Sequence, residues 1–289
     1  MSHNTNPAPA VDEAAAAARQ AGGFLSVAGV ASGKNDGWTD PERSPEGETT
    51  TVPLTDEQRA RHERLVAEWV GKLENETAEG ILSWANEHLD GAIAVTLSMQ
   101  DTVLAELAER TLTGSTTNRA ELVFLDTGYH FAETLDTARA VEDRYSLPLR
   151  TVTPTLTRAQ QDDEYGLNLY RRNPTACCRM RKVEPLARML NPFEAWVSGV
   201  RRVDSPLRAN TSVIEVDRTG RLKLNPIAAW TDEDVANFIE DNHLIINPLT
   251  QQGYPSIGCE TCTLPVAEGE DPRSGRWAGT NKTECGLHL

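Results

Sequence analysis

Two cysteine pairs lie far apart in this sequence, and any fold of the chain must account for both. Cys177 and Cys178 are adjacent and lie among the cations of residues 171–182, whereas Cys259 and Cys262 form a Cys-x-x-Cys pair in a later segment. Adjacent cysteines do not easily bond to each other, because a disulfide between them strains the intervening peptide, but both can point at one metal centre. Four converging thiolates are a ligand set for zinc or for an iron–sulfur cluster. We therefore expect a fold in which the two segments meet.

Simpler interpretations of these cysteines remain open. Cys177 and Cys178 could be ordinary small buried residues, and Cys259 and Cys262 could form a redox disulfide. The combination favours a metal site, because the chain has five cysteines and four of them fall into these two pairs. The fifth, Cys285, is left over, and we interpret it as the reactive one.

The distribution of charge indicates the kind of ligand. The formal net charge is −15, which argues against a general attraction to nucleic acid or to an anionic membrane. Residues 171–208 nevertheless carry nine basic and three acidic side chains, a local net charge of +6. This concentration predicts a site for a small polyanion, and a solvated face of scattered charges is the alternative.

Length and composition suit a globular chain. At 289 residues and 39% hydrophobic content, the sequence can build one large or two small domains. No run approaches the ~18 apolar residues of a membrane span. Asp12 and Glu13 stand where a secretory signal would have a basic end and an apolar core, so we expect a cytoplasmic protein. A reducing compartment also suits thiolate ligands. The residues leave open whether the chain forms a homo-oligomer.

Three regions are expected along the chain. Residues 1–55 have few large apolar side chains and are predicted to form a disordered extension. Residues 56–262 are predicted to form an α/β domain that binds nucleotide and cluster. Residues 263–289 are predicted to be a mobile segment that carries Cys285.

Short apolar runs alternate with helical patterns in the middle of the chain. Thr55 and Thr231 are predicted to cap helices, and a further helix is expected to follow the cysteine pair as far as Leu190. The remaining predicted helices are residues 77–88, 102–110 and 133–145, and the predicted strands are 92–97, 122–125, 149–152 and 194–200. This order predicts a single open, mostly parallel sheet flanked by helices. We interpret residues 157–166 as a polar stretch, 222–226 as an edge segment, and the chain beyond Asn242 as mostly loop.

Polar residues follow the first two predicted strands. Ligands of open α/β sheets bind beyond the carboxyl ends of the strands. Residues 98–101, which include Ser98 and Asp101, and residues 126–128 fall at this edge. We therefore predict the ligand site there.

Several motifs occur between Gly91 and the end of the sequence. They are Leu125-Asp126-Thr127-Gly128, Cys177-Cys178-Arg179-Met180-Arg181-Lys182, Gly199-Val200-Arg201-Arg202, Ser205-Pro206-x-Arg208, the Cys-x-x-Cys segment 253–263, Arg273-Ser274-Gly275-Arg276-Trp277 and Glu284-Cys285-Gly286-Leu287-His288. In this order they resemble the iron–sulfur type of assimilatory adenylylsulfate (APS) reductase. That type belongs to the PAPS and APS reductase family, within the ATP-pyrophosphatase-like (adenine nucleotide alpha hydrolase-like) superfamily.

The resemblance implies a role for each matched residue. It implies that Cys177, Cys178, Cys259 and Cys262 hold a [4Fe-4S] cluster, that Lys182 lies between cluster and substrate, and that Cys285 is the nucleophile. The implied substrate-binding residues are Ser98, Asp101, Leu125, Asp126, Thr127 and Gly128 around the nucleotide, and Arg208, Arg273 and Arg276 around the phosphosulfate. The segment Leu97-Ser98-Met99-Gln100-Asp101 departs from many relatives, because it contains no glycine.

The implied reaction is the thioredoxin-dependent reduction of adenosine 5'-phosphosulfate to sulfite and AMP through an S-sulfonated Cys285. A thiolate that approaches this dianion meets several kcal/mol of repulsion, which cations must offset. His288 either favours the thiolate or is an unengaged residue near the end of the sequence. A tail that closes to attack and opens to thioredoxin would explain a nucleophile so near that end.

Other functions remain as alternatives. A PAPS reductase would use the same mechanism but lacks the four cluster cysteines. An ATP pyrophosphatase would need a Ser-Gly-Gly-x-Asp-Ser loop, which this sequence lacks. A non-catalytic iron–sulfur redox sensor would have no use for the motif around Cys285. A zinc-binding interaction module would be colourless, unlike an iron–sulfur protein.

Overall fold

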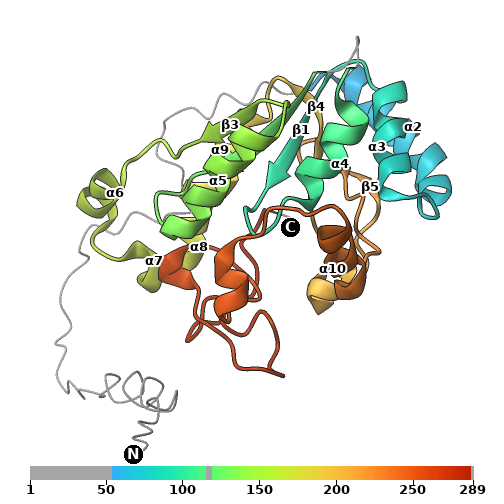
Figure 1. Cartoon of the computed structure of the whole chain (residues 1–289). Coiled ribbons are helices and arrows are strands. Elements are labelled where there is room, and N and C mark those ends of the chain that lie inside the picture. The colour runs from blue at the N-terminus through green and yellow to red at the C-terminus, as the bar shows by residue number, and fades with distance from the viewer. Residues whose placement is uncertain (1–53, 115–118, 288–289) are drawn as a thin grey trace, which may run out of the picture. The chain divides into compact units, whose positions relative to one another are not determined.

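A six-stranded sheet organises the part of the chain that the computed structural model describes, residues 54–114 and 119–287 (Figure 1). The strand order is β3-β2-β1-β4-β6-β5, and all neighbouring pairs are parallel except β5 with β6. The strands are β1 (Ala92–Leu97), β2 (Ala120–Leu125), β3 (Leu149–Val152), β4 (Phe193–Val197), β5 (Ile214–Val216) and β6 (Leu222–Leu224). The predicted open, mostly parallel sheet with flanking helices is confirmed.

Helix starts follow the capping signals of the sequence. Thr55 caps α2 and Thr231 caps α10, each in a reciprocal capping box with the residue three positions later, and Thr77 caps α3 with its hydroxyl. The helices are α2 (Asp56–Leu73), α3 (Ala78–His88), α4 (Val103–Leu112), α5 (Ala132–Arg144), α6 (Arg158–Tyr165), α7 (Leu169–Arg172), α8 (Pro174–Cys178), α9 (Glu184–Met189) and α10 (Asp232–Asp241).

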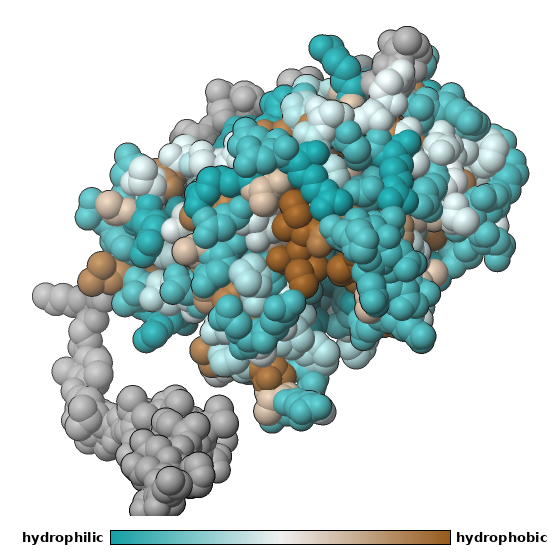
Figure 2. All heavy atoms as spheres, in the orientation of Figure 1, coloured by the Kyte–Doolittle hydropathy of each residue, from teal (hydrophilic) through white to brown (hydrophobic). Residues whose placement is uncertain are grey.

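Both faces of the sheet are covered, because successive strand residues point to opposite sides. Ile93 and Val95 of β1 belong to a large buried cluster with residues of α3, α4 and α5. Ala94, between them, packs on the other face with Leu186 and Leu190 from the region of α9. Figure 1 shows α4 and α5 in front of the sheet, and Figure 2 shows that this side is mostly hydrophilic with a hydrophobic area near its middle.

One sequence interpretation is incomplete and another is wrong. Residues 157–166 are not merely a polar stretch, because Thr157 and Gln160 form a capping box that starts α6. Residues 222–226 do not form an edge, because β6 pairs with β4 on one side and with β5 on the other. The edge strand beside β6 is the short antiparallel β5, which was not predicted.

The chain beyond α10 is mostly loop, as predicted, with the short 3₁₀ turns η4 (Pro248–Gln252) and η5 (Glu260–Cys262). Isolated bridges from Asp101 to Ile246 and from Thr263 to Arg276 tie this loop to the domain and to itself. Within the described residues, no helix is long and apolar enough to cross a membrane. The predictions for His288 and for nearly all of segment 1–55 lie outside the described residues.

Candidate active site

The loop after β1 takes its shape without glycine. Met99 has a φ of 61°, in the left-handed region that glycine usually supplies, and its side chain is fully buried. The side-chain amide of Asn247 donates to the Met99 carbonyl at 3.0 Å. Ser98 is exposed at the end of the strand, and the Asp101 carboxylate accepts from the Val103 N–H at 3.1 Å, where α4 begins. Burial raises the pKa of Asp101.

The loop after β2 points partly at the cysteines. The Asp126 carboxylate accepts from the Gly128 N–H at 2.8 Å, and Leu125 is half-buried beside it. Thr127 is fully buried, and its hydroxyl lies 3.3 Å from the sulfur of Cys259. Gly128 has a φ of +73°, and a Cβ there would lie 3.1 Å from the guanidinium of Arg181. This loop therefore contacts the cysteine region as well as the strand edge.

The cysteine pair lies on a helix of mixed type. Asn173 caps α8 through its side chain, and Cys177 and Cys178 occupy the last two positions of that helix. A π-helical turn, η1 (Arg179–Val183), follows and carries Lys182 before α9 continues. π-Turns within helices occur often at functional sites. Here the turn places Lys182 on the cysteine side of the helix.

The four paired cysteines line one cavity, although the two pairs come from distant segments. Cys177 and Cys178 from α8 and Cys259 and Cys262 from the region of η5 face it, together with Lys182. Burial and the three neighbouring thiols raise the pKa of Cys177 to about 12. Burial also raises the pKa of Cys178 and of Cys262. Thiols whose pKa is raised in this way lose their protons readily only to a bound metal centre.

The residues fit an iron–sulfur cluster. Among the described residues, no group of three or more His, Cys, Asp or Glu side chains is positioned to hold a metal ion. The four thiols nevertheless line one cavity, and cysteine thiolates are the usual ligands of iron–sulfur clusters. The hydroxyls of Thr127 and Thr261 lie 3.3 Å and 3.7 Å from the sulfurs of Cys259 and Cys262, and such contacts tune clusters.

Three cations that line the cavity, Arg181, Lys182 and Arg276, have no carboxylate partner within the described part of the chain. Arg181 is instead held by the carbonyls of Thr127 and Leu156 and by the side chain of Gln161. Arg276 donates to the Ser256 hydroxyl and to the Ile257 carbonyl, and its buried Nε has no partner. Burial and Arg273 lower the pKa of Arg276. Burial alone would lower the pKa of Lys182, but the nearby sulfurs of Cys259 and Cys285 raise it overall.

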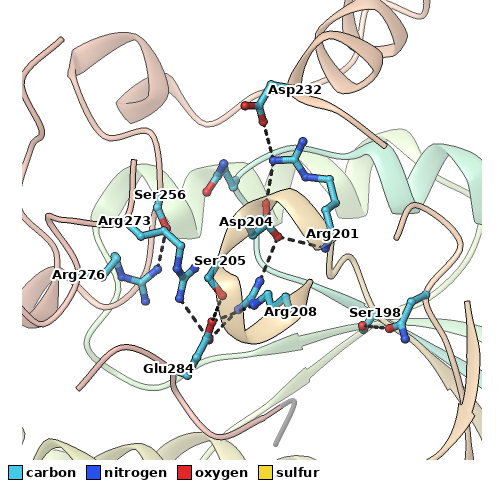
Figure 3. A network of polar contacts seen from close by, with 12 residues as sticks. Ser198, Arg201, Asp204, Ser205, Arg208, Asp232, Ser256, Arg273, Arg276 and Glu284 are labelled. Atoms are coloured by element: carbon cyan, nitrogen blue, oxygen red, sulfur yellow. Dashed lines mark hydrogen bonds and ion pairs between the residues drawn. The ribbon is translucent and has the colours of Figure 1, made fainter. Parts of the chain in front are cut away.

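Two further arginines already hold a carboxylate. Arg208 donates from Nε and Nη2 to both oxygens of Glu284, at 2.9 Å and 2.8 Å, and Arg273 donates to the same carboxylate at 3.2 Å (Figure 3). Ser205 adds a hydroxyl donor at 3.1 Å. Asp204 binds the remaining arm of Arg208 at 3.0 Å. The hydrogen bonds from Arg208 outweigh burial and lower the pKa of Glu284.

Cys285 lies between these two groups of cations. Its sulfur acts electrostatically on Lys182, Arg276 and Arg208. The next residue, Gly286, has a φ of +83°, and Leu287 packs against the buried cluster of Leu186 and Leu190. The structure thus brings the leftover cysteine close to Lys182 and Arg276, two cations that line the cysteine cavity.

A family model, the phosphoadenosine phosphosulfate reductase domain, matches residues 92–265. The chain belongs to this family. Among the reductases that it resembles, the adenosine 5'-phosphosulfate reductase of Mycolicibacterium smegmatis is 49% identical over 240 residues, which cover 83% of this chain and 98% of the relative. The adenosine 5'-phosphosulfate reductase of Mycobacterium tuberculosis is 45% identical over 260 residues, which cover 84% of this chain and 98% of the relative.

A solved structure of the reductase family has the same fold. The crystal structure of phosphoadenylyl-sulfate (PAPS) reductase from Candida auris, a phosphate complex, aligns with a TM-score of 0.59 at 25% identity. The alignment covers 74% of this chain and 100% of that one. The family resemblance seen in the motifs is therefore confirmed at the level of sequence and fold.

Some residues of the site had no predicted role. Asn247 is buried and joins the loop after β1 to Thr134 of α5 at 3.1 Å. Tyr129 lines the cysteine cavity with Arg158 and Arg181 against its ring, at 4.5 Å and 5.0 Å from its centre. The sequence assigns Glu284 no role beyond its place in a motif. Its position before the leftover cysteine was the one signal that could have drawn attention to it.

Proposed function

We propose that this chain reduces adenosine 5'-phosphosulfate to sulfite and AMP in sulfate assimilation, with Cys285 as nucleophile and thioredoxin as reductant. The observation that carries this proposal is the position of Cys285 near Lys182 and Arg276, two cations that line the cavity of the four paired cysteines. The relatives named adenosine 5'-phosphosulfate reductase support the choice of substrate.

In the first step the Cys285 thiolate attacks the sulfur of the substrate. A bond forms between the cysteine sulfur and the substrate sulfur, and the bond from that sulfur to the bridging phosphate oxygen breaks. The electron pair of the broken bond leaves with AMP. Lys182 and Arg276 offset the repulsion between thiolate and substrate and stabilise the charge that grows on the phosphate oxygen.

In the second step a thiolate of reduced thioredoxin attacks the sulfur of S-sulfonated Cys285. Sulfite leaves with the electron pair of the sulfur–sulfur bond, and a mixed disulfide forms. The second thiol of thioredoxin resolves this disulfide and restores Cys285. The two electrons thus come from the dithiol, which becomes a disulfide.

Cys177, Cys178, Cys259 and Cys262 would hold a [4Fe-4S] cluster. The cluster would supply a fixed local charge and a link between α8 and the C-terminal loop. The exposed polar residues after β1 and β2, with Ser98 and Gly128 foremost, would line the nucleotide end of the site.

The substrate is tested by turnover with thioredoxin on cluster-loaded protein. We expect kcat/KM for adenosine 5'-phosphosulfate to exceed that for the 3'-phosphorylated analogue, PAPS. A clear preference for PAPS would instead place the chain with the activity named for the Candida auris structure. Absence of sulfite with either substrate would leave the redox sensor as the better function.

The metal is tested separately. Protein purified without oxygen should be brown and contain about four iron and four acid-labile sulfide atoms per chain. Stoichiometric zinc with no sulfide would contradict the cluster proposal.

A further inference from the structure

Glu284, the residue before Cys285, is an almost fully buried carboxylate. Its side chain is 7% exposed, and it accepts four hydrogen bonds, two from Arg208, one from Arg273 and one from Ser205 (Figure 3). A carboxylate loses favourable hydration on burial, and a bidentate arginine pair with further donors is the geometry that restores it. Glu284, in the tail segment 283–287, is therefore held by a receptor that Arg208, Arg273 and Ser205 form.

Residues outside the tail also hold Arg208 in place. Asp204 holds Arg208 at 3.0 Å and Arg201 at 2.9 Å, and Arg201 also pairs with Asp232 at 2.8 Å. These contacts lie outside the tail and fix the plane of the Arg208 guanidinium. A rigid guanidinium binds a carboxylate in one geometry, so it sets the position of the residue that carries it.

The cations Arg208, Arg273, Lys182 and Arg276 differ in what balances their charge. Arg208 and Arg273 are balanced by Asp204 and Glu284, so this group of four is neutral while the tail is in place. Lys182 and Arg276 have no such partner within the described residues. A dianionic substrate would gain most electrostatic stabilisation from Lys182 and Arg276, because no carboxylate of the described residues already balances their charge.

A second contact holds the tail on the other side of Cys285. Leu287 packs against the apolar cluster that includes Leu186 and Leu190, and Gly286 makes the turn between. Contacts on both sides restrict where the Cys285 sulfur can lie. Of these two contacts, only that of Glu284 is charged. The substitution Glu284→Gln can therefore remove this charge without changing the shape of the side chain.

We propose that Glu284 is the positioning residue of the nucleophile, and that Arg208 and Arg273 act as its receptor. Glu284 fixes the tail so that Cys285 lies beside Lys182 and Arg276. Release of the Cys285 adduct to thioredoxin then requires the Glu284 pairs to break. This inference rests on the proposed function for its catalytic consequence, but the attachment itself can be tested without substrate.

The first test is hydrogen–deuterium exchange of residues 283–287 in cluster-loaded protein without nucleotide. In Glu284→Gln the amide keeps the shape but loses the charge and the paired acceptors, so the tail should exchange at least tenfold faster than in wild type. Glu270→Gln is the matched control, because Glu270 is an exposed carboxylate on the same loop with no ion pair in the described structure. Equal exchange in Glu284→Gln and wild type would overturn the proposal, whatever the chain's activity.

The second test separates positioning from substrate binding. In single-turnover assays at saturating adenosine 5'-phosphosulfate, Glu284→Gln should form the Cys285 adduct at least tenfold more slowly, with AMP affinity unchanged. Glu284→Asp, which keeps the charge on a shorter stem, should recover part of the rate. A rise in KM at unchanged adduct rate would assign Glu284 a different role.

The third test asks what Arg273 binds. Arg273→Gln should release the tail much as Glu284→Gln does, and the double variant should be little worse than either single one, because both remove the same contact. If Arg273→Gln leaves tail exchange unchanged but weakens substrate binding, Arg273 is a substrate ligand and the proposal fails. If no variant forms sulfite but the exchange pattern holds, the proposed function has failed and the attachment stands.

Discussion

The two pairs of cations around Cys285 differ in what balances them. Arg208 and Arg273 face the carboxylate of Glu284 at 2.8–3.2 Å, and Asp204 completes the set. Lys182 and Arg276 face sulfurs, a hydroxyl and a backbone carbonyl. The comparison teaches that the number of cations near a site says little about anion binding until their partners are known. In the proposed scheme the paired arginines hold Glu284, and the cations without a carboxylate partner among the described residues are left to meet the substrate.

The largest effect is expected from Lys182→Ala. This change removes an unpaired charge beside Cys285, so formation of the S-sulfonate should slow by about 10³-fold, or about 4 kcal/mol. Iron and sulfide content should stay near wild type. Arg179→Ala is the control, because Arg179 lies on the same π-turn but pairs with Glu184 at 3.7 Å. Mass spectrometry of the Cys285 peptide measures the adduct, and equal rates in the two variants would break the comparison.

Arg276→Ala should have a somewhat smaller effect. Arg276 donates hydrogen bonds to the Ser256 hydroxyl and the Ile257 carbonyl, so these protein oxygens already offset part of its charge. We expect adduct formation to fall about 10²-fold, with the cluster spectrum unchanged. Bleaching of the cluster as the main result would show that Arg276 supports the metal centre and not the substrate.

Glu194 provides a paired carboxylate with a purely structural role. Burial would raise its pKa, but hydrogen bonds from His62 and the Gly91 N–H, with the charge of Arg61, lower it to about 2. Because this pKa is depressed, the stabilisation is complete above pH 4.5 and is lost as the pH falls towards 2. Glu194→Gln should lower the free energy of unfolding by about 2 kcal/mol at pH 7.

Denaturation midpoints measured across pH check this prediction. The gap between wild type and Glu194→Gln should be constant from pH 8 to about 5 and narrow below pH 4.5. Glu63→Gln, which removes an exposed carboxylate from α2, should show almost no gap. A gap that widens on acidification would contradict the assigned direction.

The smallest effect is expected from Gly258→Ala. A Cβ at this position would lie 2.1 Å from Nη2 of Arg276, so the guanidinium must move away from its place beside Cys285. Adduct formation should fall about tenfold with little loss of stability, because the clash is with the end of a flexible side chain. Gly71→Ala is the control, since nothing lies within 4 Å of its Cβ position. Unchanged kinetics would mean that Arg276 acts equally well from a shifted position.

Local signals in the sequence predicted much of the fold. β1 and β3 were predicted with the bounds observed, and Thr55 and Thr231 cap helices as expected. β5 was missed because three residues carry too little pattern, and its pairing with β6 depends on contacts across the sheet. The meeting of the cysteine pairs followed from their chemistry. The partner of Glu284 could not be predicted, because an ion pair between residues 76 positions apart has no local signal.

The π-helical turn η1 changes the direction in which one helix faces. A turn closed by i→i+5 bonds holds one residue more than an α-helical turn, so the residues beyond it are rotated by about 100° relative to a regular helix. Cys177 and Cys178 therefore face the cysteine cavity, while Leu186 and Met189 pack against the sheet in the cluster that includes Ala94. Loss of one residue between 179 and 183 would restore the regular helix and turn either the cysteines or the leucine away from its partners. The spacing of this segment is thus constrained as tightly as its composition.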